Sequence, residues 1–193
     1  MPAKNYRGPR QPRRRSILAP GPAIDDPSWG VRNNLQAESN VGRLLAHWRR
    51  KGMPLIHVRH VSRQEDSTYR DGQAGVEFKA VALPLNGETV VTKHACNAFV
   101  GTDLEARLRR SGSDDVVIAG VITNNSVEAT ARMSGDLGFR TVVVSDATFT
   151  FGRKDFEGRP RSAEEVHAMS LANLSGEYAL VCTTDQVIQM THT

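Results

Sequence analysis

Cysteine is scarce in this sequence, and its scarcity excludes several classes of protein. Only Cys96 and Cys182 occur among 193 residues. Two cysteines cannot build a disulfide framework or a cysteine-based metal site, so we expect a chain of the reducing cytoplasm. No run approaches the roughly 18 apolar residues that cross a membrane, and no apolar segment follows the basic start. We therefore expect neither a membrane protein nor a secretory signal.

Acidic residues are missing from the first 15 residues, which contain Lys4 and five arginines. This stretch has three prolines and almost nothing apolar, so we expect residues 1–15 to form a disordered basic tail. The rest of the chain carries 19 basic and 21 acidic side chains, which argues against a nucleic-acid-binding body. Only the tail is expected to touch nucleic acid or an acidic partner, and a solvated tail without any partner is the simpler interpretation.

A spaced cluster of histidine and carboxylate residues is also missing, although His57 and His60 are close in sequence. We therefore expect neither a metal nor another cofactor. Hydrophobic residues make up 39% of the chain and charged residues 24%. This composition and length predict one domain over residues 16–193, with a sizeable core.

From residue 16 onward, short apolar runs alternate with amphipathic ones. Strands are predicted at 54–60, 87–93, 114–122, 140–147 and 178–184, and a turn is predicted at Asn86-Gly87. Helices are predicted at 34–52 with Gly52 as its stop, at 102–111 with a capping box of Thr102 and Glu105, at 124–138 with Gly138 as its stop, and at 162–177. The alternation predicts an α/β fold with a parallel sheet.

Ligands of open α/β sheets bind beyond the carboxyl ends of the strands. This rule places candidate site residues around Ala19, His60 and Lys93 and in the stretches 122–126 and 146–149. The first strand must end by about Ala19, because Pro20 and Pro22 cannot lie in a central strand. The polar segment 61–81 is a candidate lid, a contact between subunits or a plain loop.

Five stretches of the chain resemble the isochorismatase-like superfamily, the cysteine hydrolases that include nicotinamidases, N-carbamoylsarcosine amidases and isochorismatases. They are DDPSWGVRNN (25–34), PLIHVRH (54–60), VVTKHACNAFVGTDLEARLR (90–109), GVITNNSVEATARMSGDLGFRTVVVSDATFTF (120–151) and AEEVHAMSLANLSGEYA (163–179). The resemblance covers nearly all of residues 16–187. It implies a three-layer α/β/α, Rossmann-like fold with a parallel sheet of five to six strands, and a homo-oligomer, either dimer or tetramer.

The resemblance also implies a triad of Asp, Lys and Cys, in which the thiolate attacks a carbonyl while Asp and Lys manage the protons. Lys93 in VVTK matches the lysine, whereas Ser126 in TNNS stands at the cysteine position. Counting back from DDPSWG, Ala19 stands at the aspartate position. Asp25 in AID is a rival for the acid, but that alignment needs a deletion before DPSWG.

Further residues become candidates for substrate binding through their places at strand ends or in the family's pocket. They are Trp29, His60, His94, Val121, Ile122, Asn125 and Phe149. The family has a cis peptide just before its cysteine motif, here Val121–Ile122, which shapes an oxyanion hole. Each candidate has a structural alternative: Trp29, Phe149 and Phe151 as packing residues, the histidines as local hydrogen-bonding groups, and Asn124 and Asn125 as helix caps.

Losing the thiol and the acid is expected to remove the thioester mechanism. A serine alkoxide is much harder to form than a thiolate, and Ala19 cannot accept a proton. Without its carboxylate partner, a buried Lys93 needs a lowered pKa, a new anionic partner or an anionic ligand. It is then a candidate general acid, clamp on a carboxylate or imine-forming amine, and otherwise a solvated lysine.

Three hypotheses follow for the function. The first is a repurposed small-molecule enzyme that performs acid–base chemistry on a polar or carboxylated metabolite, with specialised biosynthesis as one setting. The second is a non-catalytic pseudoenzyme that keeps the fold for oligomer formation or ligand sensing. The third is an amide hydrolase that depends on Ser126 or is inactivated by a Cys-to-Ser change there. Because fold does not settle function, the site has to decide among them.

Overall fold

The computed structural model describes residues 15–19, 24 and 26–191, with the backbone alone for residues 15–19. The predicted tail therefore lies outside the described residues, except for Arg15. That residue is wrongly assigned to the tail, because it begins the first strand and its backbone pairs with Asp115. Pro20, Pro22 and Asp25 also lie outside the described residues.

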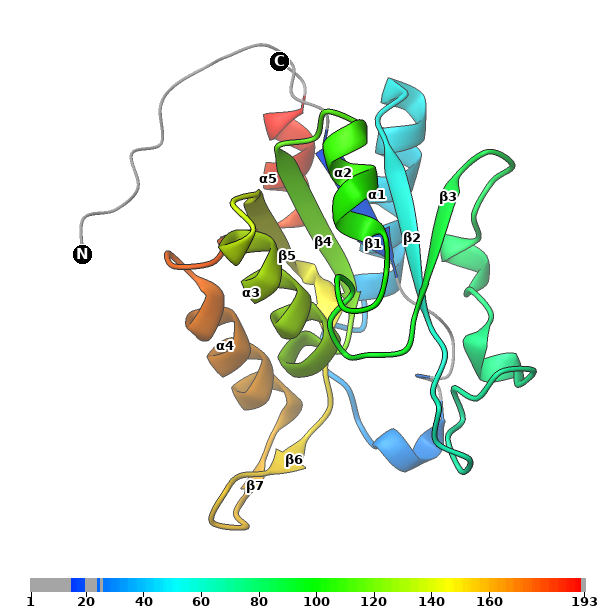
Figure 1. Cartoon of the computed structure of the whole chain (residues 1–193). Helices are drawn as coiled ribbons and strands as arrows, with labels where there is room; N and C mark the ends of the chain where they lie inside the picture. The colour runs from blue at the N-terminus through cyan, green and yellow to red at the C-terminus, as the bar shows by residue number, and fades with distance from the viewer. Residues whose placement is uncertain (1–14, 20–23, 25, 192–193) are drawn as a thin grey trace.

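One parallel sheet of six strands organises the fold, in the order β3-β2-β1-β4-β5-β8 (Figure 1). Its strands are β1 (Arg15–Ala19), β2 (Leu55–His60), β3 (Thr89–Lys93), β4 (Asp115–Val121), β5 (Arg140–Phe149) and β8 (Leu180–Cys182). A short antiparallel hairpin of β6 (Arg153–Lys154) and β7 (Pro160–Arg161) projects beyond the carboxyl ends of the strands. The predicted parallel sheet is confirmed, and the first strand ends at Ala19 as expected.

Helices cover both faces of the sheet, which confirms the three-layer α/β/α architecture (Figure 1). One face carries α1 (Ala37–Lys51) and α5 (Thr184–Met190), and the other carries α2 (Leu104–Arg110), α3 (Glu128–Asp136) and α4 (Ala163–Leu174). Gly52 ends α1 with a φ of 60°, a left-handed conformation that a glycine adopts without strain. The sequence pattern predicts neither α5 nor the β6–β7 hairpin.

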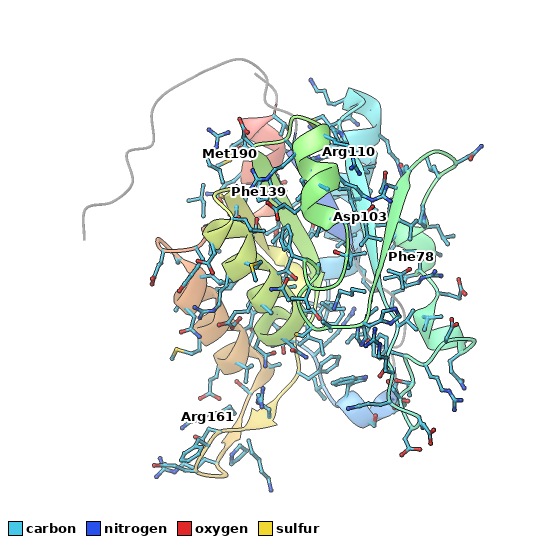
Figure 2. The ribbon with its side chains drawn as sticks, viewed as in Figure 1. Phe78, Asp103, Arg110, Phe139, Arg161 and Met190 are labelled. Carbon is cyan, nitrogen blue, oxygen red and sulfur yellow. The ribbon has the colours of Figure 1, made fainter. Side chains whose placement is uncertain are left out.

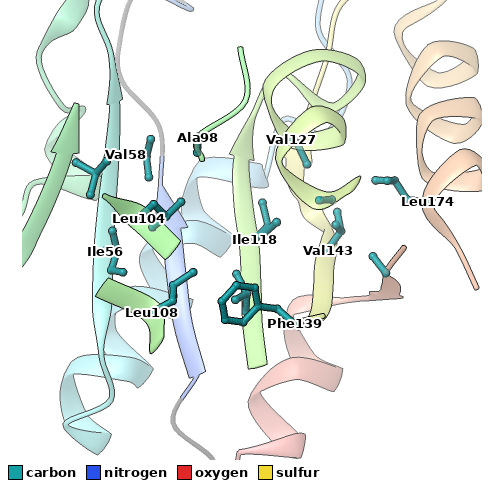
Figure 3. Close-up of a cluster of buried hydrophobic side chains, with 14 residues drawn as sticks. Ile56, Val58, Ala98, Leu104, Leu108, Ile118, Val127, Phe139, Val143 and Leu174 are labelled. Atoms are coloured by element: carbon teal, nitrogen blue, oxygen red, sulfur yellow. The ribbon is translucent and has the colours of Figure 1, made fainter. Parts of the chain in front are cut away.

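The strand β4 is buried on both faces because successive side chains point to opposite sides of a sheet. Val116 and Ile118 pack with α2, α3 and α4, whereas Val117 and Ala119 pack with α1 and α5. Figure 3 shows the first of these two cores, where Leu104 and Leu108 of α2 lie against the sheet. Among the described residues, no helix has the length and apolar character needed to cross a membrane.

The start of α2 differs from the prediction, because no capping box forms there. The helix begins at Leu104, and the hydroxyl of Thr102 accepts the Leu104 N–H at 3.3 Å while it donates to the Ala98 carbonyl at 2.6 Å. Glu105 pairs instead with Arg109, four residues further along the helix, at 2.8 Å. Thr102 therefore fixes the loop before the helix rather than the helix itself.

The predicted helix 124–138 is also different at its start. Residues Thr123–Val127 form a π-helical turn, in which the N–H of Val127 bonds to the carbonyl of Ile122 at 3.2 Å. The prediction that Asn124 and Asn125 act as caps is wrong, because both lie inside this turn. Such widened turns are rare and occur frequently at functional sites.

The two cores give a first testable prediction. Leu108 is fully buried, so Leu108→Ala is expected to lower the free energy of unfolding by about 2–5 kcal/mol. Met169 in α4 is 64% exposed, so the control Met169→Ala is expected to change it by less than about 1 kcal/mol. Urea denaturation with an unchanged m-value measures both. A similar loss in the two variants would contradict the packing described here.

Candidate active site at the carboxyl edge of the sheet

Lys93 and Ser126 meet at the carboxyl edge of the sheet. Lys93 is the last residue of β3, and Ser126 lies in the π-helical turn that follows β4. The Nζ atom of Lys93 donates to the Oγ atom of Ser126 at 3.2 Å. Both residues are candidates from the sequence, and the structure brings them into contact although β3 and β4 are not neighbours in the sheet.

The Lys93 ammonium is held by neutral oxygen atoms. Its Nζ atom also donates to the backbone carbonyls of Ala95 at 2.8 Å and Cys96 at 2.7 Å. An ammonium has three donors, so these bonds and the one to Ser126 use all of them. No carboxylate forms an ion pair with Lys93 in the part of the chain that the structure describes. Among the described residues, the hydrogen-bond partners of Lys93 are therefore uncharged oxygens.

Burial determines the protonation of this lysine. The side chain is only 5% exposed, and its desolvation lowers the pKa of Lys93 from 10.5 to about 8. The electrostatic interaction with Cys96 acts in the opposite direction and raises this pKa. Lys93 is thus a buried amine that gives up its proton only slightly above neutral pH.

Cys96 is the site residue that sequence reasoning missed. It lies in the loop between β3 and α2 and is exposed. Its Sγ atom donates to Oδ1 of Asn125 at 2.6 Å and lies 3.9 Å from Oγ of Ser126. The signal in the sequence is a cysteine three residues after the strand-end lysine. Its importance depends on the loop folding back over the start of α3, which spacing alone does not predict.

The two candidate histidines flank this cluster without joining it. His94 is exposed, and its Nδ1 atom bonds to the carbonyl of Val61 at 2.8 Å, so this histidine makes a local hydrogen bond. His60 ends β2, and its Nδ1 atom is buried and has no hydrogen-bond partner among the described residues. Burial, with the charges of Lys93 and His94, lowers the pKa of His60 to about 4.

The aromatic candidates belong to packing. Trp29 stacks on Phe151 with ring centroids 5.5 Å apart, and Phe149 is buried under the guanidinium of Arg32, 4.2 Å above its ring. Val121 and Ile122 pack against the same small cluster, and the peptide between them is cis, as the resemblance implies. Phe149 also lines an apolar pocket, and neither Lys93 nor Ser126 belongs to its lining. The other lining residues are Ile24, Ala37, Glu38, Val41, Lys79, Val81, Ala82, Gly120 and Ala147.

A second polar network connects the π-helical turn to α4 and to the segment before α1. The hydroxyl of Thr123 is 2.9 Å from Nδ1 of His167 on α4, and Nε2 of that ring is 3.3 Å from Nδ2 of Asn34. Asn34 also donates to the carbonyls of Ser145 and Thr148 in the second half of β5. These contacts tie the segment before α1 to the site, and the sequence contains no pattern that predicts them.

Ala19 and the segment 61–81 are the remaining candidates from the sequence. Ala19 pairs with His57 of β2 at the carboxyl end of β1, between β2 and β4. The segment 61–81 contains turns and the short 3-10 helices Ala74–Val76 and Ala80–Ala82. Across the described residues, no three of the His, Cys, Asp and Glu side chains gather as ligands of a metal ion.

Comparisons with known proteins agree on one family. The isochorismatase domain matches residues 23–186. The isochorismatase family protein YrdC of Bacillus subtilis is 40% identical over 86% of this chain and 89% of its own length, and YddQ of the same organism is 34% identical over 81% and 87%. A crystal structure of an isochorismatase-family protein from Chromobacterium violaceum is 49% identical, covers 99% of this chain and 98% of its own, and superimposes with a TM-score of 0.91.

The buried lysine gives a prediction about pH. Because its pKa falls from 10.5 to about 8 on folding, the native state binds fewer protons than the unfolded chain between these values. Stability from this group therefore rises as pH increases from 8 to 10.5. We expect the wild type to gain unfolding free energy relative to Lys93→Met across that window, as measured by urea denaturation. The exposed lysine variant Lys154→Met should show no such trend, and a flat difference for Lys93→Met would contradict the assignment.

Proposed function

This chain belongs to the isochorismatase family, and from that membership we propose that it is a small-molecule enzyme whose reaction centre is Lys93 with Ser126. The proposed ligand is a polar metabolite that carries a carboxylate, and the proposed chemistry is acid–base chemistry without a thioester at position 126. One observation carries this proposal. A buried ammonium, held only by neutral oxygens among the described residues, lies 3.2 Å from a hydroxyl at the carboxyl edge of the sheet.

The charge of Lys93 is the reason to propose an anionic ligand. Burying a cation without a counter-ion is costly, and three hydrogen bonds to neutral oxygens offset this cost only in part. A ligand carboxylate beside the ammonium would supply the missing charge. Ser126 offers the point of contact, because its oxygen accepts from Lys93 and its own proton remains available to donate to the ligand.

The lowered pKa of Lys93 suits a group that moves protons. A general acid or base works best when its pKa is close to the operating pH. With a pKa of about 8, Lys93 exists in both forms near neutral pH and can pass a proton through the Ser126 hydroxyl to a bound substrate. Reactions that fit this centre are eliminations, rearrangements and the hydrolysis of vinyl ethers.

A serine-dependent hydrolase is the second candidate, and the pKa of Lys93 separates it from the first. Ser126 becomes a nucleophile only when a neighbouring base takes its proton. Lys93 is that neighbour, and it is a base only in its neutral form, above a pH of about 8. Attack by Ser126 should therefore increase as pH rises through 8, whereas carboxylate binding by the ammonium should decrease.

The test is a thermal-shift and activity screen of aromatic acids, cyclic vinyl ethers, amides and ureas. We expect carboxylates to stabilise the wild type at pH 7 by about 2.7 kcal/mol at 100 times their Kd. The stabilisation should weaken above pH 8 and disappear in Lys93→Met, because it depends on the charge of the ammonium. The exposed lysine variant Lys154→Met is the matched control and should respond like the wild type.

Other outcomes of the screen contradict the proposal in distinct ways. Turnover of amides that rises through pH 8 and is lost in Ser126→Ala would favour the serine hydrolase. Equal stabilisation of the wild type and Lys93→Met would place the ligand elsewhere. No response to any compound would favour a pseudoenzyme that retains the fold for oligomer formation or ligand sensing.

A further inference from the structure

Three exposed apolar side chains lie at the carboxyl end of the molecule and have no role in the proposed function. They are Phe156, Val31 and Leu35, which are 105%, 86% and 72% exposed, more than any other large apolar side chain of the described residues. Phe156 lies in the turn of the β6–β7 hairpin, and Val31 and Leu35 lie in the segment before α1. Single exposed apolar residues are ordinary, whereas a group of them on one surface marks an interaction site.

The hairpin and the segment before α1 are joined to each other at their base. Arg32 pairs with Phe151 in an antiparallel bridge, and the N–H of Asn33 donates to the Thr150 carbonyl at 3.2 Å. Figure 2 shows the hairpin, on which Arg161 is labelled, projecting at the same end of the molecule as this segment. The apolar side chains of the two segments therefore belong to one surface, in which each has a fixed place.

The turn of the hairpin is held by the carboxylate of Asp155. Its Oδ1 atom accepts the N–H groups of Glu157 at 3.0 Å and Arg159 at 2.9 Å, and its Oδ2 atom accepts from the guanidinium of Arg161 at 2.7 Å. These bonds fix the turn around Phe156 and leave its ring in solvent. A rigid aromatic side chain loses little conformational entropy when it binds, so it is an effective anchor for a partner.

This surface carries charges of both signs, one on each segment. The hairpin, residues 153–161, has four basic and two acidic residues, whereas the stretch 25–38 has three acidic and one basic. On the hairpin, Arg153 and Lys154 are exposed and form no ion pair with any described residue. In the other segment, the carboxylate of Asp26 accepts a backbone N–H at 2.9 Å and has no cationic partner among the described residues. The two segments are therefore complementary in charge.

We propose that this surface is the contact of a twofold dimer, in which Phe156 of each protomer packs against Val31 and Leu35 of the partner subunit. A twofold contact uses the same surface of both protomers, so the anchor and the patch that receives it must lie together on one chain. Here they do, and the basic hairpin then faces the acidic stretch of the second copy. A nucleic acid or an anionic membrane fits less well, because the acidic stretch repels it. The inference does not depend on the proposed function.

The experiment measures self-association of the full chain by sedimentation velocity over a range of concentrations. We expect a monomer–dimer equilibrium for the wild type. Phe156→Ser should raise the dissociation constant of the dimer at least about 30-fold, the effect of losing one anchor residue of an interface. The double variant Val31→Ser with Leu35→Ser should also raise it. The matched control Met169→Ser removes an exposed apolar side chain from α4 and should leave the constant unchanged. All four side chains are exposed, so the variants are expected to fold.

A cross-linking experiment tests which residues meet in the dimer. In a Cys96→Ser background, Glu157→Cys protein is mixed with Gln36→Cys protein and oxidised with copper–phenanthroline. These positions are next to Phe156 and Leu35 in the sequence and are exposed, so the apolar contact itself stays intact. We expect a disulfide between the two proteins, identified by peptide mass spectrometry. The matched mixture of Met169→Cys with Gln36→Cys should form much less of it.

Three results would overturn the inference. A wild type that stays monomeric and forms no preferred disulfide would make Phe156 an ordinary exposed side chain. A dimer that is as stable in Phe156→Ser as in the wild type would place the contact on another surface. A monomer that binds RNA or anionic vesicles, and loses this binding in Phe156→Ser, would assign the hairpin to that partner. Because none of these variants alters Lys93 or Ser126, the thermal-shift screen decides the proposed function separately.

Discussion

The burial of β4 on both faces is the constraint on which the rest of this structure depends. Its side chains alternate between two apolar cores, so polar chemistry cannot lie along the strand. After the apolar residues 116–119 of β4, the chain becomes polar again in the π-helical turn that carries Ser126. Parallel strands bring their carboxyl ends to one edge, and Lys93 at the end of β3 therefore reaches the same place. Packing of the sheet thus brings Lys93 and Ser126 together at its carboxyl edge.

The position of Lys93 follows from this arrangement, and the burial of its charge costs free energy. A lysine at an exposed edge would be solvated, but this one is covered by its own loop and bonds to the carbonyls of Ala95 and Cys96. These bonds keep the ammonium in place, and burial still lowers its pKa to about 8. The same cation holds the loop and bonds to Ser126, and in the proposed function its charge also attracts the ligand, so structure and the proposed chemistry depend on a single group.

At two positions the sequence differs from the pattern of the family that it resembles. The family resemblance places alanine and serine where an acid and a thiol are expected, at positions 19 and 126. The fold nevertheless brings a different thiol, that of Cys96, to within 3.9 Å of the Ser126 hydroxyl. Considered one position at a time, the resemblance leaves only Lys93 of the three expected residues. Considered in three dimensions, the edge of the sheet holds the Lys93 ammonium, the Ser126 hydroxyl and an exposed thiol.

The sequence by itself determined the layered α/β fold, most element boundaries to within a few residues, and the choice of Lys93 and Ser126 as candidates. These features depend on local periodicity and on short motifs, which are encoded within a few consecutive residues. Several features were decided only by the tertiary structure: the π-helical turn in place of caps at Asn124 and Asn125, the packing of Trp29 on Phe151, and the placement of Cys96. Each of these depends on contacts between segments far apart in the chain. Spacing cannot predict such contacts, because they exist only after the loops have closed over the sheet.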